Sequence, residues 1–393
     1  MDYAFDFDLQ INRLGTSSVK YDFLSEYISG ADSDTLALWV ADMDFRSPEP
    51  IIEELKKRAE HGIFGYTHYP DSYYRGLESW FERKYNVEIN RKWVLHSPGV
   101  LSGINAAIQA LTQPSDGIIL QPPVYYPFFE CIRGNQRKII ENPLIFVENN
   151  YQMDLKGLKS ILNRDVDNNI KMLILCHPHN PIGRVWSRAE LSELFGILQS
   201  KNIILVSDEI HCDLIYPDNH FESMLSIVGP AENLIVCTSA SKTFNLAGLQ
   251  LSNLFIPNQK YRESMKRVLR ALGLVHPNCF APIATEIGYT HPECEIWLKK
   301  MMEYVKNNLE FMKSFFSMHI PKIKIIQPQG TYLVWLDFRD FNLSDSQIND
   351  LLVKDAKVAL DDGTIFGTGG SGFQRINIAC PRSLLEKALN RIL

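Results

Sequence analysis

The sequence predicts an α/β fold with a mostly parallel sheet and, beside it, a smaller α+β domain. Two observations predict this architecture. Between residues 93 and 256, short apolar and β-branched runs alternate with helical patterns, and such alternation is typical of a parallel sheet covered by helices. After about residue 285 the alternation stops, and a long helical stretch is followed by strand-like runs and a final helix.

The apolar runs of the first part predict buried strands. Each is short and rich in Val, Ile and Leu, as expected of a strand with helices on both faces. Residues 103–111 and 188–200 predict intervening helices, and Ser187 with Glu190 three residues on forms the N-terminal signal of the second. The predicted strands cover residues 93–96, 117–120, 172–176, 203–207, 234–239 and 251–256.

The second part has a different order of elements. Residues 293–316 predict a long helix, and the segments KIKIIQ, TYLVWLDFR and RINIAC predict strands. The apolar run at 36–40 is expected to pack with this part. We therefore expect a large domain over residues 48–285 and a small domain formed by residues 1–47 and 286–393, with a cleft between them.

The composition excludes several classes of protein. The 46 acidic and 40 basic residues give a formal charge of −6 and form no long run of either sign, so neither nucleic acid nor a membrane is expected as a partner. No stretch approaches the roughly 20 apolar residues that span a bilayer, and the N-terminus lacks a leader pattern. The seven scattered cysteines show no CxxC spacing, which favours reduced thiols over a zinc site. We expect a cytoplasmic protein without a metal.

Residues of chemical interest follow the predicted strands directly. Because parallel sheets bind ligands at the carboxyl ends of their strands, we expect these segments to meet at one edge. A glycine before a helix, as at Gly99, leaves the N–H groups of Val100 and Leu101 free for a phosphate. The segments are 99–100, 122–126, 177–183, residue 208 and 239–242.

Lys242 stands at the end of one strand, in the string SASKTFNLAGL. One interpretation is a lysine that leaves the sheet edge for solvent. Its neighbours favour another: serines at minus one and minus three, Asp208 at the end of a parallel strand, and the Asn180–Pro181 turn at the end of another. A cofactor that carries a carbonyl group needs these residue types.

Longer motifs give these residues a family context. The strings PHNPIGRVW, SDEIHCDL and SASKTFNLAGL resemble the aspartate aminotransferase-like fold of pyridoxal-phosphate enzymes (fold type I), whose large domain has a seven-stranded type of sheet. The strings LWVADMDFRSP, FGYTHYP, QPPVYYPF and RINIACPR resemble its cystathionine β-lyase, or carbon–sulfur lyase, branch. The resemblance covers nearly the whole chain and implies pyridoxal 5'-phosphate as cofactor.

The resemblance implies roles for four residues at the cofactor ring. Lys242 would hold the cofactor as a Schiff base and, once substrate displaces it, act as the base at Cα. Asp208 would pair with the protonated pyridine nitrogen, Asn180 would bind the phenolic oxygen, and Tyr125 would stack on the ring. Without the motifs, Asp208 is also compatible with a helix N-cap, and Asn180 and Tyr125 with ordinary turn and core residues.

The resemblance also implies how the phosphate is held. Ser239, Ser241 and the N–H groups of Val100 and Leu101 would surround it, joined by Tyr66 from a second subunit. If Tyr66 crosses in this way, the active enzyme is a homodimer with sites at the subunit interface.

Substrate contacts and departures from the family follow from the same comparison. Arg375 would bind the substrate α-carboxylate by a two-point contact, although by alternation in its strand it would face solvent, and the Val40–Ala41 backbone would form a second wall. Many aminotransferases of this fold have a phosphate-binding arginine where this chain has Gln250, and a tyrosine where it has His211. His211 is equally compatible with a cofactor contact and with a core histidine.

The expected reaction is β-elimination from a sulfur amino acid such as cystathionine, giving a thiol, pyruvate and ammonia. Transamination uses the same residues and is the alternative enzyme function, because only the branch motifs separate the two. A third interpretation is a regulatory protein that binds a transcription factor, which a large exposed apolar patch away from the cleft would favour.

Overall fold

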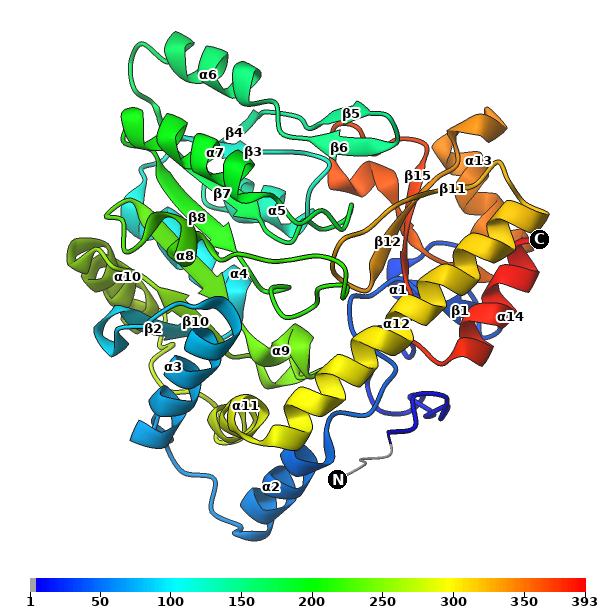
Figure 1. Cartoon of the computed structure of the whole chain (residues 1–393), viewed down its shortest axis with the longest axis horizontal. Coiled ribbons are helices and arrows are strands. Elements are labelled where there is room, and N and C mark those ends of the chain that lie inside the picture. The colour runs from blue at the N-terminus through cyan, green and yellow to red at the C-terminus, as the bar shows by residue number, and fades with distance from the viewer. Residues whose placement is uncertain (1–4) are drawn as a thin grey trace.

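The computed structural model describes residues 5–393, and a large twisted sheet lies at its centre (Figure 1). Within these residues the sheet has seven strands in the order β2-β10-β9-β8-β7-β3-β4. The strands β4, β3, β7, β8 and β9 are parallel, and β10 runs antiparallel to both of its neighbours. Their bounds are β2 (Val94–Ser97), β3 (Gly117–Leu120), β4 (Lys138–Glu141), β7 (Ile170–Cys176), β8 (Ile204–Asp208), β9 (Leu234–Thr238) and β10 (Ser252–Phe255).

Helices bury both faces of this sheet. Ile204 and Val206 of β8 belong to one hydrophobic cluster, with α4 (Val100–Leu111), α5 (Pro127–Gly134) and α10 (Gln259–Ala271). Leu205, between them, belongs to the other cluster, with α3 (Asp71–Tyr85), α7 (Arg188–Ser200) and α11 (Ala281–Thr290). Successive strand residues point to opposite faces, so the continuous apolar runs of the sequence are explained by cover on both sides.

The predicted N-terminal signal of α7 is confirmed. The Ser187 hydroxyl accepts the backbone N–H of Glu190 at 3.3 Å, and the Glu190 carboxylate accepts the backbone N–H of Ser187 at 2.8 Å. This capping box satisfies two donors that have no partner inside the helix. It fixes where the chain turns after leaving β7.

A second sheet lies beside the first, and the long helix α12 (Pro292–His319) passes in front of this second part in the view of Figure 1. Within the described residues its order is β11-β12-β15-β14, all antiparallel. The short strand β1 (Leu36–Ala37) pairs in parallel with β13 (Val358–Ala359), so the N-terminal run packs with this part as expected. The bounds are β11 (Lys324–Ile326), β12 (Leu333–Asp337), β14 (Asp361–Asp362), β15 (Phe373–Asn377), α13 (Asp345–Asp350) and α14 (Arg382–Ile392).

Smaller elements complete the chain. The hairpin β5 (Ile145–Val147) and β6 (Asn150–Gln152) extends beyond the large sheet. The remaining α-helices are α1 (Leu24–Tyr27), α2 (Glu49–Glu60), α6 (Leu155–Arg164), α8 (Met224–Val228) and α9 (Ala240–Thr243), with single helical turns at 91–93, 247–249, 339–341, 351–355 and 363–366.

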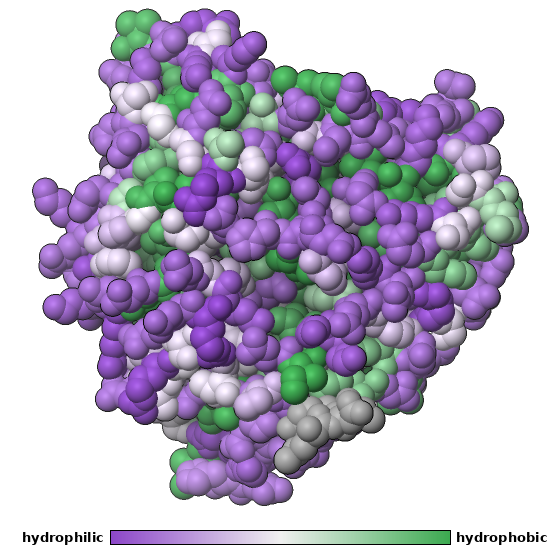
Figure 2. All heavy atoms as spheres, in the orientation of Figure 1, coloured by the Kyte–Doolittle hydropathy of each residue, from purple (hydrophilic) through white to green (hydrophobic). Residues whose placement is uncertain are grey.

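The predicted α/β class is confirmed, and one strand of the large sheet was not predicted. The missed strand, β4, is the edge strand next to β3, and its ends Lys138 and Glu141 are exposed. Charged ends are common on edge strands and hide their apolar pattern. Of the helices formed by residues 5–393, none is long and apolar enough to span a bilayer. The face in Figure 2 is mostly hydrophilic, with apolar side chains in small scattered groups.

Candidate active site

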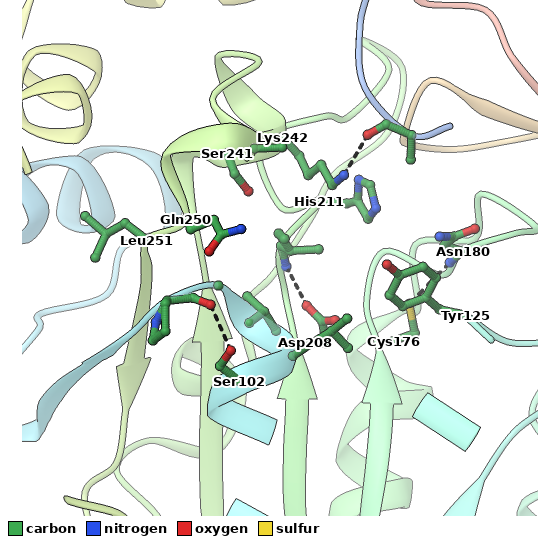
Figure 3. Close-up of a pocket in the computed structure, with 17 residues that line it drawn as sticks. Ser102, Tyr125, Cys176, Asn180, Asp208, His211, Ser241, Lys242, Gln250 and Leu251 are labelled. Atoms are coloured by element: carbon green, nitrogen blue, oxygen red, sulfur yellow. Dashed lines mark hydrogen bonds between the residues drawn. The ribbon is translucent and has the colours of Figure 1, made fainter. Parts of the chain in front are cut away.

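A cavity of about 400 Å³ lies where β7, β8 and β9 end and α4 begins (Figure 3). This is the edge at which the sequence predicts that chemical residues meet. The residues from the sequence analysis that line it are Ala41, Gly99, Val100, Leu101, Tyr125, Asn180, Asp208, His211, Ser241, Lys242 and Gln250.

Lys242 reaches the cavity from α9, the short helix that follows β9. Its Nζ donates a hydrogen bond to the Ala41 carbonyl oxygen at 2.6 Å, and the Tyr332 hydroxyl donates to the same oxygen at 2.9 Å. Burial lowers the pKa of Lys242 to about 8, with Arg375 also lowering it and the carboxylates Asp42 and Asp208 raising it. A lysine in this range supplies free amine near neutral pH. Because its Nζ is bound inside the cavity, the interpretation of a solvent-facing lysine is wrong.

Asp208 ends β8 at the floor of the cavity. One of its oxygens accepts the Ile210 backbone N–H at 3.1 Å, and within residues 5–393 no cation forms an ion pair with it. Burial raises the pKa of Asp208 to about 7. A buried carboxyl without a cationic partner favours any ligand that brings a positive charge to it.

Tyr125 and Asn180 occupy the side of the cavity opposite α4 (Figure 3). The Tyr125 ring meets the Phe128 ring edge-on, with centroids 5.5 Å apart, which fixes its plane. The Asn180 backbone N–H donates to Cys176 Sγ at 3.3 Å, while its Oδ1 accepts from Arg375. The structure therefore holds an aromatic face and an amide group at one end of the cavity.

The other end of the cavity is the N-terminus of α4. Gly99 has φ of 84°, a left-handed value that glycine adopts without strain, and it directs the first N–H groups of the helix toward the cavity. Ser241 and Gln250 line the same end. Among the described residues that line the cavity, Lys242 is the one lysine or arginine, and the N-terminus of α4 adds positive potential at this end.

Three predicted site residues do not line the cavity in this chain: Ser239, Tyr66 and Arg375. The Ser239 hydroxyl is buried: it donates to the Leu251 carbonyl at 2.5 Å and accepts the Ser241 backbone N–H at 3.1 Å, so it caps α9 instead. The Tyr66 side chain is 97% exposed, with its ring 5.5 Å from that of His276. In this chain the Tyr66 ring therefore lies outside the cavity.

Arg375 lies behind the cavity in β15 and is buried, so the solvent-facing interpretation is wrong. Its Nη1 donates to Asn180 Oδ1 at 3.0 Å, and its Nη2 donates to the Trp39 carbonyl at 2.9 Å and to the Asp361 carboxylate. Its Nε has no partner among residues 5–393. The side chain thus links the small sheet to the cavity and keeps one donor unused.

Several residues of the site were not identified from the sequence. Asp361 stands directly opposite Arg375 in the β14–β15 register, and nothing in its own string indicates that pairing. Cys176 and Ser102 line the cavity as well. Cys176 is the last residue of a predicted strand, so its position at the strand end was the available signal.

His211 lies in the cavity with a buried Nδ1 that has no partner among the described residues. Burial, together with the nearby cations Lys242 and Arg375, lowers the pKa of His211 to about 3. The imidazole is therefore neutral and can donate or accept one hydrogen bond. With Asp208 and Asn180, it completes a set of buried polar groups that suit a bound ring with a basic nitrogen and an oxygen substituent.

Comparison with known proteins agrees with this site. A family model described as aminotransferase class I and II matches residues 33–392. The chain is 38% identical over 388 residues to cystathionine beta-lyase PatB of Bacillus subtilis, covering 98% of both chains. It superposes on pyridoxal 5'-phosphate-containing cystalysin from Treponema denticola with a TM-score of 0.94, 35% identity and coverage of 99% and 98%. It superposes on a pyridoxal-phosphate-bound C-S lyase from Staphylococcus hominis with a TM-score of 0.91, 29% identity and coverage of 99% and 98%.

Proposed function

The chain belongs to the aminotransferase class I and II family, and on that premise we propose that it is a pyridoxal-phosphate-dependent carbon–sulfur β-lyase. Its substrate is a sulfur amino acid, and its products are a thiol, pyruvate and ammonia. The relatives PatB, cystalysin and the Staphylococcus hominis C-S lyase support this function over transamination.

The observation that carries the proposal is the Lys242 amine, which lines the same cavity as Asp208, Asn180 and Tyr125. When bound, pyridoxal phosphate supplies a carbonyl carbon for attachment and a ring that withdraws electrons from the substrate. In our proposal Lys242 binds that carbon, and Asp208 pairs with the ring nitrogen. Asn180 and His211 serve the ring oxygen.

The phosphate is assigned to the α4 end of the cavity. The Val100 and Leu101 N–H groups and the Ser241 hydroxyl are the donors, and Gln250 adds a neutral amide. The Ser239 hydroxyl acts indirectly, because its hydrogen bonds orient Ser241 and Leu251. This end is short of positive charge, which makes a donor from a second subunit useful.

Lys242 then carries the proton through the reaction. With a pKa of about 8, about a tenth of the amine is free at pH 7, enough to act as a base. Nζ accepts the proton from the substrate Cα and delivers it to the sulfur as the Cβ–S bond breaks. The three-carbon enamine that remains adds water and yields pyruvate and ammonia.

The substrate α-carboxylate is assigned to Arg375 and to the backbone of Val40 and Ala41. A guanidinium matches the two oxygens of a carboxylate, and the Arg375 Nε is buried without a partner. Residue 41 lies at the cavity wall beside Lys242. This arrangement would hold the Cα–H bond close to Nζ.

We also propose a homodimer in which Tyr66 of each chain serves the site of the other. Exposed apolar side chains precede both Tyr66 and its ring partner His276 in the chain, namely Ile63 and Phe64, and Leu274 and Val275, and such a cluster is typical of an interface. His276, beside Tyr66, lines a second cavity that shares Gln250 with the first. The apolar surface therefore borders the phosphate end of the site.

The domain division stays part of the proposal: residues 48–285 form the large domain, and residues up to 47 with 286–393 form the small one, the first four lying outside the described residues. The two separate sheets support it. The seven buried cysteine thiols suit a reducing compartment, and we propose the cytoplasm as the location.

The test incubates the purified protein with pyridoxal phosphate and L-cystathionine, and measures pyruvate and free thiol together. We expect equal amounts of both without an added keto acid. Lys242→Ala should lower the rate at least about 10³-fold, because it removes both the attachment point and the base. Lys201→Ala is the matched control, since it removes an exposed lysine amine that does not line the cavity.

A different result would favour transamination. In that case no pyruvate forms, and an added keto acid is converted to its amino acid at the expense of the sulfur substrate. Equal rates for the wild type and Lys242→Ala would contradict both enzyme functions.

A further inference from the structure

The helix α9 carries Lys242 and has only four residues, Ala240–Thr243. From it the Lys242 side chain extends across the cavity toward His211 (Figure 3), and its Nζ donates to the Ala41 carbonyl oxygen at 2.6 Å. In the proposed reaction the amine leaves this oxygen to take the Cα proton. Because proton transfer needs the base within hydrogen-bond reach, α9 needs an anchor that does not depend on Ala41.

The residue after Lys242 supplies such an anchor. Thr243 is fully buried, and its hydroxyl donates to Asp213 Oδ2 at 2.7 Å. Asp213 lies two residues after His211, in the segment that follows β8. The contact therefore ties the helix of Lys242 to the segment that begins with Asp208 and includes His211.

Two aromatic side chains of α3 hold Asp213 in turn. The Trp80 Nε1 donates to Asp213 Oδ1 at 3.1 Å, and the Tyr85 hydroxyl donates to the same oxygen. Trp80 is itself buried and stacks on Tyr289 of α11, with ring centroids 5.1 Å apart. Since these two donors engage Oδ1, Oδ2 stays directed at Thr243.

The link between Thr243 and Asp213 has the features of a strong hydrogen bond. Burial raises the pKa of Asp213, and its three hydrogen bonds counteract that effect. Bonds to a carboxylate are shorter and roughly twice as strong as those between neutral groups. Neither residue lines the cavity, so the pair acts on Lys242 through the backbone of α9.

We propose that Asp213 is a positioning residue for Lys242: through the Thr243 hydroxyl it fixes α9 against the segment after β8, so that Nζ keeps its place when it leaves Ala41. The inference rests on the proposed lyase function, which requires Nζ to move to the substrate Cα. Asp213 and Thr243 exchange no proton with the substrate. A merely stabilising contact would lower the melting temperature and leave the reactivity of Lys242 unchanged.

The test compares two Thr→Val variants, which remove a buried hydroxyl and keep the branched side chain. Thr243→Val breaks the contact with Asp213. Thr112→Val is the matched control: Thr112 is buried after the C-terminal end of α4 and away from the cavity wall, where its hydroxyl donates to the Ile108 carbonyl at 2.6 Å and accepts from Arg137 at 2.9 Å. Both variants should lower the melting temperature of the cofactor-free chain, so stability does not separate them.

The first readout is the attachment of pyridoxal phosphate to Lys242, which needs no substrate. The cofactor-free chain is mixed with pyridoxal phosphate, samples are reduced with borohydride over time, and peptide mass spectrometry gives the modified fraction of Lys242. For Thr243→Val we expect attachment about 10-fold slower than in the wild type, within the roughly 10²-fold that a misplacement of 1 Å can cost. Thr112→Val should match the wild type, and Thr243→Ser, which keeps the hydroxyl, should restore the rate.

The second readout separates kcat from KM in pyruvate release. We expect Thr243→Val to lower kcat about 10-fold at a nearly unchanged KM, because the base is displaced while the groups assigned to the substrate carboxylate are untouched. Thr112→Val should keep both values.

A double variant tests the role of Asp213 itself. In Asp213→Asn the amide oxygen should face Trp80, whose Nε1 can only donate, which leaves the amide nitrogen beside Thr243 and weakens the link. Asp213→Asn combined with Thr243→Val should lose no more kcat than Thr243→Val alone, because both changes act on one contact. Losses that multiply would overturn the proposal.

The proposal is also overturned if Thr243→Val attaches the cofactor at the wild-type rate, or if Thr112→Val is slowed equally. If Thr243→Val does not fold, Thr243→Ala takes its place with the same expectations. The lyase function fails separately: a wild type that attaches the cofactor and releases no pyruvate loses that function, yet slower attachment in Thr243→Val alone would still support the role of Asp213. Conversely, an active lyase with equal attachment in both variants keeps its function and loses this inference.

Discussion

Replacing Arg375 should affect stability and substrate binding by two separable routes. Its partner Asp361 is buried, with the side chains of the pair 3% and 4% exposed. Arg375→Gln leaves that carboxylate without a cation, and breaking a buried pair in this way costs about 3–5 kcal/mol. For a chain of 393 residues, this corresponds to a fall in melting temperature of about 3–6 °C.

The pH dependence of this loss has a defined sign. Burial raises the pKa of Asp361 and Arg375 lowers it, so Arg375→Gln leaves the raising effect alone. A carboxyl whose folded-state pKa lies above its unfolded value stabilises the protein at low pH and loses that effect as the pH rises. The melting deficit of Arg375→Gln should therefore be smaller at pH 5 than at pH 8.

The double variant Arg375→Gln with Asp361→Asn separates stability from function. Removing both charges should recover most of the melting temperature, because no unpaired charge stays buried. It should not recover kcat/KM, which we expect to be about 10²-fold below wild type after the loss of a charge-assisted carboxylate contact.

The assays are thermal melts of the cofactor-free chain at both pH values and pyruvate release with L-cystathionine. The reasoning is refuted if Arg375→Gln melts within 1 °C of the wild type at pH 8, or if the double variant is no more stable than the single one.

Three further predictions concern the cofactor site. Because burial raises the pKa of Asp208 to about 7, above its unfolded value, this carboxyl stabilises the cofactor-free chain at low pH and loses that effect as the pH rises toward 7 and beyond. Asp208→Asn should therefore reduce the loss of melting temperature between pH 5 and pH 8, and an identical slope would contradict this. Gln250→Arg should lower the Kd for pyridoxal phosphate about 10-fold in equilibrium dialysis, by adding a charged donor at the phosphate end; an unchanged Kd would count against that assignment. Tyr66→Ala and Lys242→Ala subunits, each nearly inactive, should regain about a quarter of the wild-type rate when dissociated and mixed, since half of the dimers are mixed and each contains one complete site. No recovery would mean that Tyr66 does not serve the partner's site.

The strand ends show how far local sequence reasoning reaches. The run IILVS (203–207) predicts a strand buried on both faces with Asp208 directly after it, and the structure has β8 there with Asp208 as its last residue. Lys242 follows β9 in the same way. Because parallel strands present their carboxyl ends at one edge, a single rule places both residues in one cavity. The edge strand β4 escaped this reasoning because its ends are charged and exposed.

Contacts between distant segments could not be predicted in this way. Alternation in its strand suggested that Arg375 faces solvent, but the register of β14 against β15 sets Asp361 opposite it and buries both. The Ser239 hydroxyl was expected at the phosphate, whereas the close approach of Leu251 engages it in a backbone contact.

The sequence by itself determined the α/β class, the order of the buried strands and the chemical residues at their ends, because apolar periodicity and the position after a strand are local properties. Only the tertiary structure decided which partners those residues meet: Ala41 with Lys242, Asp361 with Arg375, and Asp42 with Arg13. These pairs join residues far apart in the chain or in separate strands, and their contacts depend on register and packing, which no local pattern contains.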